Sequence, residues 1–417
     1  MGSIFVRRAG EEQAERMKKV CMVAYTNYLS DARPRREAEA LVSRGDKVDF
    51  IALAEKDQPE TEIVEGVRLL RVKQYRYRGS SSLKYILSYM SFIYIAATKL
   101  MRNFRRERYD IVYLHTMPDL IILVGMIPKL FGATVVLDIH DMMPELYMSK
   151  FGISERHLLI RLIALMEQMA IRLADRVICV HQPHLEVLCR RGASRAKITI
   201  VPNVPDLRIF GCGKLPVKST QSKFRIVYHG TIARRLGLDL AVRAFAKVVN
   251  DCPDTRLEIY GDGDAAEEVA EQIVVSGVSD KVYFSRKLFR VESVAEMLQG
   301  ASLGIIPNRR DLATEYMLPV KLLEYVQLGI PVATPRLKAI SYYFNEKQVA
   351  FYEPGEVDAL AEVIRRLYHH ADERDALVRE AGEFAKVFCW DVIKFNLFAV
   401  IDGAKESPEV QAILERA

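Results

Sequence analysis

Short runs rich in Val and Ile alternate with stretches of helical periodicity along the whole chain, and this alternation restricts the fold more than any other feature. Strands that alternate with helices form βαβ units, whose sheets are parallel. In the first half we expect strands at Val20–Ala24, Val48–Ala52, Ile111–Leu114, Thr134–Leu137, Val177–Val180 and Ile198–Val201. In the second half we expect them near Arg225–Tyr228, Arg256–Tyr260, Lys281–Phe284, Leu303–Ile306, Val332–Ala333 and Ala350–Tyr352. Two successive sets predict an α/β protein with two doubly wound, Rossmann-like domains.

The length of 417 residues also favours two domains, because a single hydrophobic core seldom grows that large. A stretch with Pro, Gly and polar residues but no periodicity predicts a linker at 205–223. The predicted domains are therefore 1–204 and 224–390, and a last amphipathic helix within 391–417 is expected to pack back on the first domain. Ligands of open α/β sheets bind beyond the carboxyl ends of the strands. The active site is therefore expected in a cleft between the two facing sheets.

Basic and aromatic residues crowd the segment 73–108, although the net charge of the chain is only +6. Such interleaving suits either nucleic acid or an anionic membrane surface, and we favour the membrane because no RNA-binding motif accompanies it. Polar residues interrupt the apolar stretch Tyr85–Met101, which predicts a helix packed on a sheet in preference to a transmembrane span. The six cysteines lack paired spacing, and the N-terminal region lacks an apolar signal segment. Both features predict reduced thiols in a cytoplasmic protein.

The segment Leu318–Ala333 carries the strongest functional signal. Pro319 can open a helix and Gly329 can close it, and the N-terminus of such a helix offers free backbone N–H groups to a phosphate. Glu324, one turn further on, can bind ribose hydroxyls through both carboxylate oxygens. The alternative is an amphipathic core helix with Glu324 solvated at its edge.

Further motifs decide between these interpretations. Leu318–Ala333 closely resembles the P-x-K-L-x-E-Y-x-x-x-G-x-P-V signature of the family 4 glycosyltransferases. Four more segments match that family in the same order, namely Asp138–Glu145, Ile198–Val204, Tyr228–Asp239 and Leu257–Gly263. The resemblance implies the GT-B fold, a nucleotide-sugar donor, no metal and transfer with retention of anomeric configuration. The donor, linked to UDP or GDP, is a substrate, and no cofactor is expected.

The resemblance also implies which residues bind the donor. Gly230 ends a strand at a tight turn where the backbone, with Thr231, can approach the pyrophosphate. Arg234 or Arg235 can neutralise its charge, because a guanidinium donates two parallel hydrogen bonds to phosphate, and we favour Arg235. The alternative for this pair is an exposed loop. The other expected donor-binding residues are Gly261, Lys321, Leu322 and Glu324.

The expected catalytic residues are His140, Asp141 and Glu315. Glu324 matches the second glutamate of the family's E-x7-E pair, whereas Tyr316 stands at the first position. The adjacent Glu315 either takes that role or is a plain loop carboxylate. His140 follows a strand and, by the resemblance, contacts the donor sugar, while Asp141 can lie near the acceptor hydroxyl. We predict no metal site at 138–141 or 261–264, because Asp and Gly are common in such turns for backbone reasons.

Asp31, Arg33 and Arg36, which follow the first strand, suit an acceptor that carries phosphate, such as a lipid-linked saccharide. The alternative is a polar first turn of a helix. His115 is expected to line the same cleft. The combined interpretation is a cytoplasmic enzyme, peripheral to the inner face of the cell membrane, that binds no nucleic acid and builds surface polysaccharide or glycolipid. Two other functions remain open, namely a non-hydrolysing nucleotide-sugar epimerase and a nucleotide-sugar-binding protein without catalysis.

Overall fold

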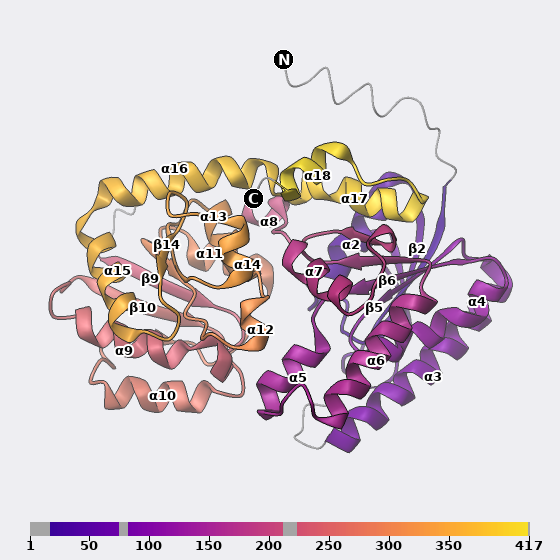
Figure 1. Ribbon diagram of the computed structural model, residues 1–417, viewed down its shortest axis with the longest axis horizontal. Coiled ribbons are helices and arrows are strands. Elements are labelled where there is room, and N and C mark those ends of the chain that lie inside the picture. Colours follow the sequence, from indigo (N-terminus) through magenta and orange to yellow (C-terminus); the bar gives the residue numbers. More distant parts are fainter. Residues whose placement is uncertain (1–16, 75–81, 212–222, 416–417) are drawn as a thin grey trace, which may run out of the picture. The chain divides into compact units, whose positions relative to one another are not determined.

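The computed structural model describes residues 17–74, 82–211 and 223–415 (Figure 1). Contacts between residues divide the chain into two compact units. The first unit holds the residues up to Asp138 together with Arg172–Val177, and the second holds Ile139–Ile171 and Ile178–Ala417. Both contain parallel strands connected by helices, so the predicted α/β class is confirmed.

The first sheet has eight strands in the order β3-β4-β2-β1-β5-β6-β7-β8. Strand β1 pairs in parallel with both β2 and β5, so the strand order reverses beside β1. The bounds are β1 Lys19–Ala24, β2 Lys47–Leu53, β3 Thr61–Val64, β4 Val67–Val72, β5 Ile111–His115, β6 Thr134–Ile139, β7 Arg176–Cys179 and β8 Ile198–Ile200. The helices of this half are α2 Ala32–Arg44, α3 Ser82–Glu107, η1 Asp119–Gly125, α4 Met126–Leu130, α5 Met143–Phe151, α6 Leu158–Leu173, α7 Gln182–Arg190, η2 Arg195–Lys197 and α8 Leu207–Phe210.

The second sheet has six strands in the order β11-β10-β9-β12-β13-β14, and all its pairs are parallel. The strand order reverses between β9 and β12, which lie side by side. The bounds are β9 Phe224–His229, β10 Thr255–Tyr260, β11 Val282–Phe284, β12 Leu303–Ile305, β13 Val332–Pro335 and β14 Ala350–Tyr352. Because ligands of such sheets bind beyond the carboxyl ends of strands at this reversal, the residues that follow β9 and β12 are the first place to look for a site.

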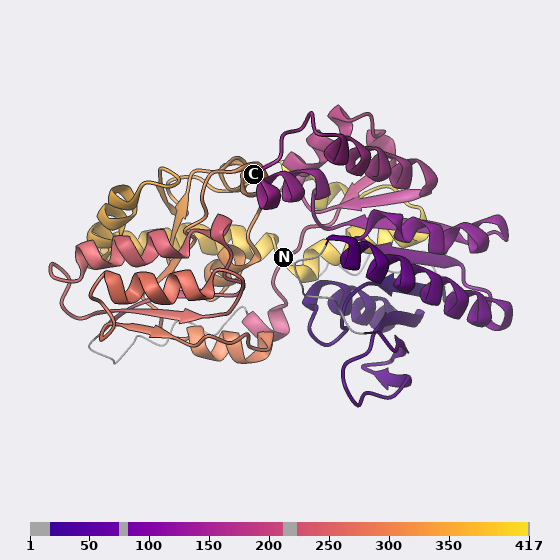
Figure 2. The ribbon, with the colours of Figure 1, turned by 90° about the horizontal axis from the view of Figure 1, so that it is seen from below.

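The helices of the second half cover this sheet and hold its core. Their bounds are η3 Arg234–Leu236, α9 Leu238–Val248, α10 Ala266–Val275, α11 Val291–Leu298, α12 Leu312–Glu315, α13 Val320–Gln327, α14 Lys338–Tyr343, α15 Val357–His369, α16 Ala371–Val387, α17 Trp390–Asp402 and α18 Pro408–Glu415. Helices α9 and α10 run side by side (Figure 2). Fully buried side chains such as Ile226, Phe245, Leu257 and Ile364 form the core beneath them.

All twelve strands expected from the sequence are present, with ends that differ by a residue or two. The hairpin β3–β4 was not predicted, because its Thr, Glu and Arg residues hide the apolar alternation. Its turn is formed by Glu65 and Gly66, both with positive φ, 48° and 79°. Two successive residues with positive φ match the right-handed twist of hairpin strands.

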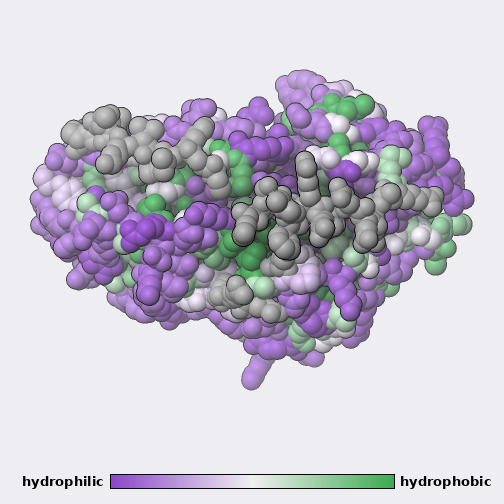
Figure 3. Space-filling model, turned by 90° about the horizontal axis from the view of Figure 1, so that it is seen from above, coloured by the Kyte–Doolittle hydropathy of each residue, from purple (hydrophilic) through white to green (hydrophobic). Residues whose placement is uncertain are grey.

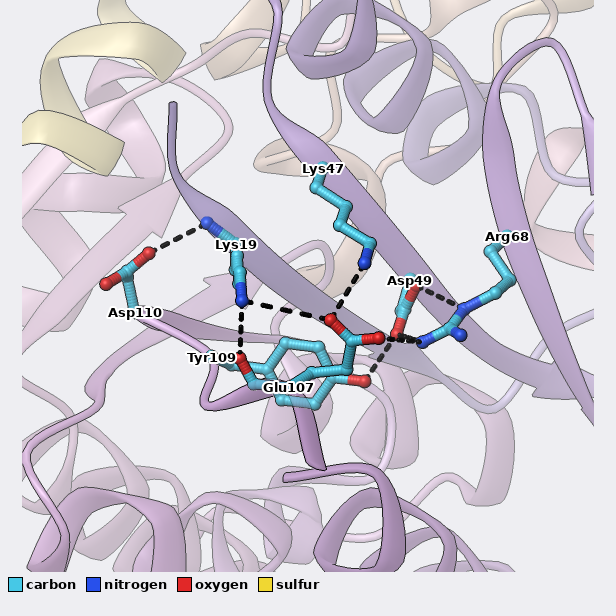
Figure 4. Close-up of polar contacts among 7 residues, drawn as sticks. All are labelled: Lys19, Lys47, Asp49, Arg68, Glu107, Tyr109 and Asp110. Carbon is cyan, nitrogen blue, oxygen red and sulfur yellow. Dashed lines mark hydrogen bonds and ion pairs between the residues drawn. The ribbon is translucent and has the colours of Figure 1, made fainter. Parts of the chain in front are cut away.

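A polar cluster fastens the end of α3 to the amino-terminal ends of the strands (Figure 4). The Glu107 carboxylate accepts a hydrogen bond of 2.8 Å from Lys47 Nζ, and the Glu107 carbonyl accepts one of 2.9 Å from Lys19 Nζ. The buried Asp49 carboxylate accepts hydrogen bonds from Arg68 and from the Tyr109 hydroxyl. This cluster stands at the edge of the sheet opposite to the carboxyl ends, so it holds the fold together away from any expected ligand.

The apolar stretch Tyr85–Met101 lies within α3, whose Phe92, Ala96 and Leu100 are buried. In the described part of the chain, no helix combines the length and the apolar composition that crossing a bilayer requires. The basic and aromatic residues at 75–78 and Cys212 lie outside the described residues. The five described cysteines form no disulfide.

The C-terminal helices contact the last strand of the first sheet. The buried Asn396 of α17 donates a 3.0 Å hydrogen bond from Nδ2 to the carbonyl of Ile200 in β8. The Asn396 Oδ1 atom accepts a 3.2 Å hydrogen bond from the backbone of Ser407. One side chain therefore joins α17 to β8 and to the start of α18.

Candidate functional site

Two glycine turns at the carboxyl ends of β9 and β10 pack backbone against backbone. Gly230 has a φ of +104°, and its N–H donates to the Tyr260 carbonyl at 2.9 Å. A Cβ atom on Gly261 would lie 2.0 Å from the Gly230 carbonyl oxygen, and a Cβ atom on Gly263 would lie 2.1 Å from that of Ile232. Only glycine fits at these points. The result is close backbone packing between the ends of β9 and β10, next to the reversal of strand order.

The loop after β12 packs against the loop after β9 in the same way. A Cβ atom on Gly237 would lie 2.0 Å from the Pro307 carbonyl oxygen. The Arg309 guanidinium binds the Asp239 carboxylate with both Nη atoms, at 2.7 and 2.6 Å. These contacts fix the loops after the two central strands relative to one another.

Helix α13 begins after Pro319, which has the extended backbone of an N-cap, and it is followed by Gly329 with a φ of +70°. The helix predicted between these two residues is therefore present. Leu322 is fully buried, so its side chain belongs to the core. Lys321 and Glu324, by contrast, lie toward the glycine turn after β9.

The Lys321 amine is shielded from solvent and has no hydrogen-bond partner among the described residues. Its Nζ atom lies 3.8 Å from the centre of the Tyr228 ring and 3.4 Å from where a Cβ atom on Gly230 would stand. Burial lowers the pKa of this amine to about 7, the Glu324 carboxylate opposes that shift, and the Arg235 charge adds to it. A buried amine costs free energy unless a counter-charge approaches it, so this position favours an anion.

The structure separates the two arginines that the sequence left as alternatives. Arg234 is exposed, and its Nη2 atom lies 2.8 Å from the Glu268 carboxylate. Arg235 is half-buried, and its Nε atom is buried without a hydrogen-bond partner among the described residues. Of the two arginines, Arg235 is the one whose charge lowers the pKa of Lys321. Thr231 is exposed beside it, and its carbonyl accepts the Tyr228 hydroxyl at 2.7 Å.

Glu324 is buried, and its Oε2 atom lies 3.0 Å from His229 Nε2. The His229 ring stands edge-on to Tyr325, with 5.3 Å between the ring centres. The Tyr325 hydroxyl in turn donates to the Val227 carbonyl at 3.3 Å. His229 was not among the residues predicted from the sequence. The signal was its position directly before Gly230, in a segment that matched the family.

Glu315 ends the short helix α12, which Asp311 caps through a reciprocal pair of hydrogen bonds with Thr314. The Glu315 carboxylate lies 2.9 Å from Arg310 Nε and accepts a 2.9 Å hydrogen bond from the Lys338 backbone. Among the described residues, none of its hydrogen bonds or ion pairs reaches Lys321 or Glu324.

The expected acceptor residues lie mostly in a buried polar network of the first unit. Arg33 Nη2 lies 2.7 Å from Asp138 Oδ1, and Arg33 Nε lies 3.2 Å from Glu37 Oε1. His115 Nδ1 lies 3.3 Å from Asp138 Oδ2, and the Tyr113 hydroxyl donates to Glu37 at 2.8 Å. The Arg33 charge is therefore neutralised by carboxylates of its own unit.

The other expected residues occupy different places. Asp31 is the N-cap of α2, without a capping hydrogen bond from its side chain, and Arg36 on the same helix is buried. His140 is half-buried and Asp141 is exposed, directly after β6. Among the described residues, the ligand atoms of His115, Asp138 and His140 lie within 4.8 Å of one another, so these side chains could hold a metal ion, contrary to the prediction of no metal site at 138–141. In the second unit the structure thus brings Gly230, Arg235, Gly261, Lys321 and Glu324 together with His229, while Arg234 and Glu315 are engaged elsewhere.

Comparisons with known proteins identify the family of both halves of the chain. Residues 31–204 match the glycosyl transferase 4-like domain, and residues 223–370 match the glycosyl transferases group 1 domain. An exopolysaccharide phosphotransferase of Streptomyces coelicolor is 30% identical over 239 residues, which are 54% of this chain. The match spans 23% of that protein's length.

Solved structures share the fold across both halves. The sucrose-phosphate synthase of Thermosynechococcus elongatus has a TM-score of 0.74 at 17% identity, over 93% of this chain and 98% of that one. The Anabaena protein HepE, solved in complex with UDP-glucose, has a TM-score of 0.68 at 14% identity, over 93% and 100%. WaaG, a glycosyltransferase involved in lipopolysaccharide biosynthesis, has a TM-score of 0.66 at 16% identity, over 91% and 98%.

Proposed function

Because this chain belongs to the GT-B glycosyltransferases related to family 4, we propose that it transfers a sugar from a nucleotide donor to a lipid-linked or saccharide acceptor, with retention of configuration. The reaction serves the assembly of a cell-surface polysaccharide or glycolipid. The likeness to an exopolysaccharide phosphotransferase and to a lipopolysaccharide glycosyltransferase supports that setting.

The observation that carries the proposal is the buried Lys321 amine, which has no hydrogen-bond partner among the described residues and lies at the glycine turn after β9. A nucleoside diphosphate supplies the missing counter-charge. Its pyrophosphate approaches the backbone at Gly230 and Gly261, where no side chain intervenes, and Arg235 provides the second cation. A charge-assisted hydrogen bond from each cation stabilises the bound diphosphate and, later, the leaving group.

Glu324 holds the nucleoside in this proposal. Its two carboxylate oxygens accept hydrogen bonds from the ribose hydroxyls, and His229 Nε2 lies 3.0 Å from the carboxylate. HepE was solved with UDP and with UDP-glucose, which supports a uridine nucleotide as the first donor to test, with GDP-sugars next.

We propose that His140 and Asp141 act on the donor sugar and the acceptor hydroxyl, and that Glu315 joins them when it leaves Arg310 and the Lys338 backbone. As the glycosidic bond opens, the sugar gains oxocarbenium character, and the departing phosphate oxygen takes the acceptor proton on the same face. Groups that stabilise charge at that moment lower the barrier. Since Arg33 is already bound to Asp138, we propose that it steadies Asp138 and His115 while Asp31, Arg36 and His115 form the side toward the acceptor.

The basic end of α3 supports a peripheral position at the inner face of the cell membrane. Arg102, Arg105, Arg106 and Arg108 are exposed there. Basic groups near an anionic membrane surface each contribute about 1 kcal/mol of attraction.

The donor assignment is tested by the thermal stability of the protein in the presence of UDP-, GDP- and ADP-sugars. A ligand at 100 times its Kd adds about 2.7 kcal/mol to the free energy of unfolding. We expect one nucleotide class to raise the midpoint, and we expect Glu324→Ala and Lys321→Met to lower the rise clearly. Glu271→Ala and Lys347→Met, which change exposed side chains of the same domain, are the controls. A rise of unchanged size in both site variants would contradict the proposed donor site.

The reaction class is tested by the anomeric configuration of the product, measured by NMR. Retention supports the proposal, and inversion overturns it. We also expect transfer to continue unchanged after dialysis against EDTA, because the cations in the proposed site are those of Lys321 and Arg235. Loss of transfer that Mg²⁺ or Mn²⁺ restores would show that a metal takes part.

A further inference from the structure

Helix α6 carries an apolar stripe on its outward face. Leu158, Leu162, Leu165 and Met169 are spaced four, three and four residues apart, so they lie along one side of the helix. All four are exposed, Leu158 by 68% and Leu165 by 61%. A helix at the surface of a globular protein normally places charged and polar residues there. The stripe is therefore the reverse of the usual pattern.

The inward face of α6 already has its partners. Ile160, Ile163 and Ile171 are buried, and the buried Glu167 accepts a 3.0 Å hydrogen bond from Arg191. The outward leucines are thus not needed for the core of the unit. Figure 3 shows one face of the molecule, on which hydrophilic residues predominate and hydrophobic residues form small groups. An ordered row of exposed apolar side chains marks a surface for an apolar partner.

The charges beside the stripe indicate which partner. Arg161 borders the stripe, and Arg156 precedes the helix, both with exposed side chains. The acidic residue of α6 is Glu167, which faces inward. Within α6 the outward face therefore combines leucines with the positive charge of Arg161 and no carboxylate, whereas the charge of Arg156 is offset by the adjacent exposed Glu155. Helices with an apolar face and basic borders lie in the interface of a membrane that contains anionic lipids.

A second copy of the chain fits this face less well. In an antiparallel two-fold pair, the border with Arg161 would meet the same border of the other copy, where no carboxylate stands. In a parallel pair, that border would meet the apolar side around Leu159. Neither arrangement gives the arginine a counter-charge, whereas a lipid phosphate does.

We propose that the outward face of α6 is a membrane-binding surface that inserts its leucines among the lipids of an anionic bilayer. It deepens the peripheral membrane position proposed above by naming a surface for it. The proposal does not rest on the sugar donor, since it concerns only where the protein resides.

The experiment is co-sedimentation with vesicles of phosphatidylcholine, alone or mixed with phosphatidylglycerol. We expect the protein to bind the mixed vesicles, and we expect Leu162→Glu combined with Leu165→Glu to weaken that binding at least about ten-fold, because two charges would then face the bilayer. The matched control is Val274→Glu with Val275→Glu, which alters two exposed apolar residues of α10. Arg161→Glu tests the basic border, with Arg243→Glu on α9 as its control.

Thermal midpoints and nucleotide binding, measured on every variant, show that the fold and the donor site are intact. Vesicle binding that survives the double α6 substitution overturns the inference. A dimer in light scattering that the α6 substitution dissociates, with unchanged vesicle binding, overturns it in favour of a second copy. If vesicle binding is lost as expected but no nucleotide binds any variant, the proposed function fails and the membrane surface stands.

Discussion

Lys321 is the residue whose surroundings differ most from water. Its amine faces the Tyr228 ring and lies near the positive charge of Arg235, and its pKa is lowered to about 7. A cation over an aromatic ring gains some stabilisation, but less than the hydration that it has lost. The amine is therefore half-protonated near neutral pH, and a bound anion would draw a proton to it.

This predicts that diphosphate binding depends on pH through Lys321. The bound anion favours the charged amine, so the pKa rises in the complex. Affinity is then greatest below pH 7 and falls as the pH rises above that value. Calorimetry at pH 8, in two buffers with different ionisation enthalpies, should detect proton uptake on binding of the nucleoside diphosphate.

Lys321→Arg is the matched variant, because its side chain stays charged throughout this range. It should bind without proton uptake. Lys321→Met should lose one charge-assisted hydrogen bond, worth about 1.5–3 kcal/mol. Proton uptake that persists in either variant would assign the titration to another group.

Several contacts between residues of the candidate site could not be predicted from the sequence. His229 and Glu324 are far apart in the sequence, as are Arg33 and Asp138, and their approach follows from the packing of separate elements. The choice between Arg234 and Arg235 also depended on which side of η3 faces the glycine turns. Residue types and motifs predicted the set of candidates, and tertiary structure determined their partners.

Among the elements, the turns after β9 and β10 are the most sensitive to substitution. Gly261→Ala would force a Cβ atom to within 2.0 Å of the Gly230 carbonyl oxygen. We expect the free energy of unfolding to fall by about 1–3 kcal/mol, as in other overpacked sites. Gly382→Ala in α16, where nothing lies within 4 Å, should raise it by about 0.5–1 kcal/mol. Urea unfolding of both variants checks this, and equal effects would contradict it.

The cluster at the end of α3 predicts a second stability effect. Tyr109→Phe removes the hydroxyl that donates to the buried Asp49, and the carboxylate keeps only Arg68. The expected cost is about 1–3 kcal/mol. Tyr94→Phe on the exposed side of α3 is the control, since that side chain is 72% exposed. If the thermal midpoint falls equally in both variants, the hydrogen bond from Tyr109 to Asp49 adds nothing to the stability of the fold.

The strands were the most predictable elements, because parallel strands are buried on both faces and appear as continuous apolar runs. The hairpin β3–β4 at the edge of the first sheet alternates charged and apolar residues instead, and β3 is largely exposed. The sequence feature that indicates this hairpin is its Glu65-Gly66 turn. The helix between Pro319 and Gly329 was predictable from its two ends alone.

At the scale of the whole molecule, the chain consists of two compact units and contains two sheets. The proposed donor residues all belong to the second sheet and its helices. Hydrogen exchange with a bound nucleoside diphosphate should therefore slow at 229–237 and 319–325, and stay unchanged in β2 and β4. Equal protection of β2 and β4 would place the nucleotide elsewhere. The two-domain architecture was predictable from the order of the elements, whereas contacts such as Asn396 to Ile200 were not.

The contact between the two glycine turns also limits how this scaffold can be diversified. In a combinatorial library across 229–237 and 261–263, positions 230, 261 and 263 tolerate glycine alone, because each would otherwise meet backbone or strained φ. Variation in donor preference must then come from the side chains around these three glycines, such as the exposed Thr231. Selection for a new donor sugar would therefore change the side chains around the two turns and leave the three glycines unchanged.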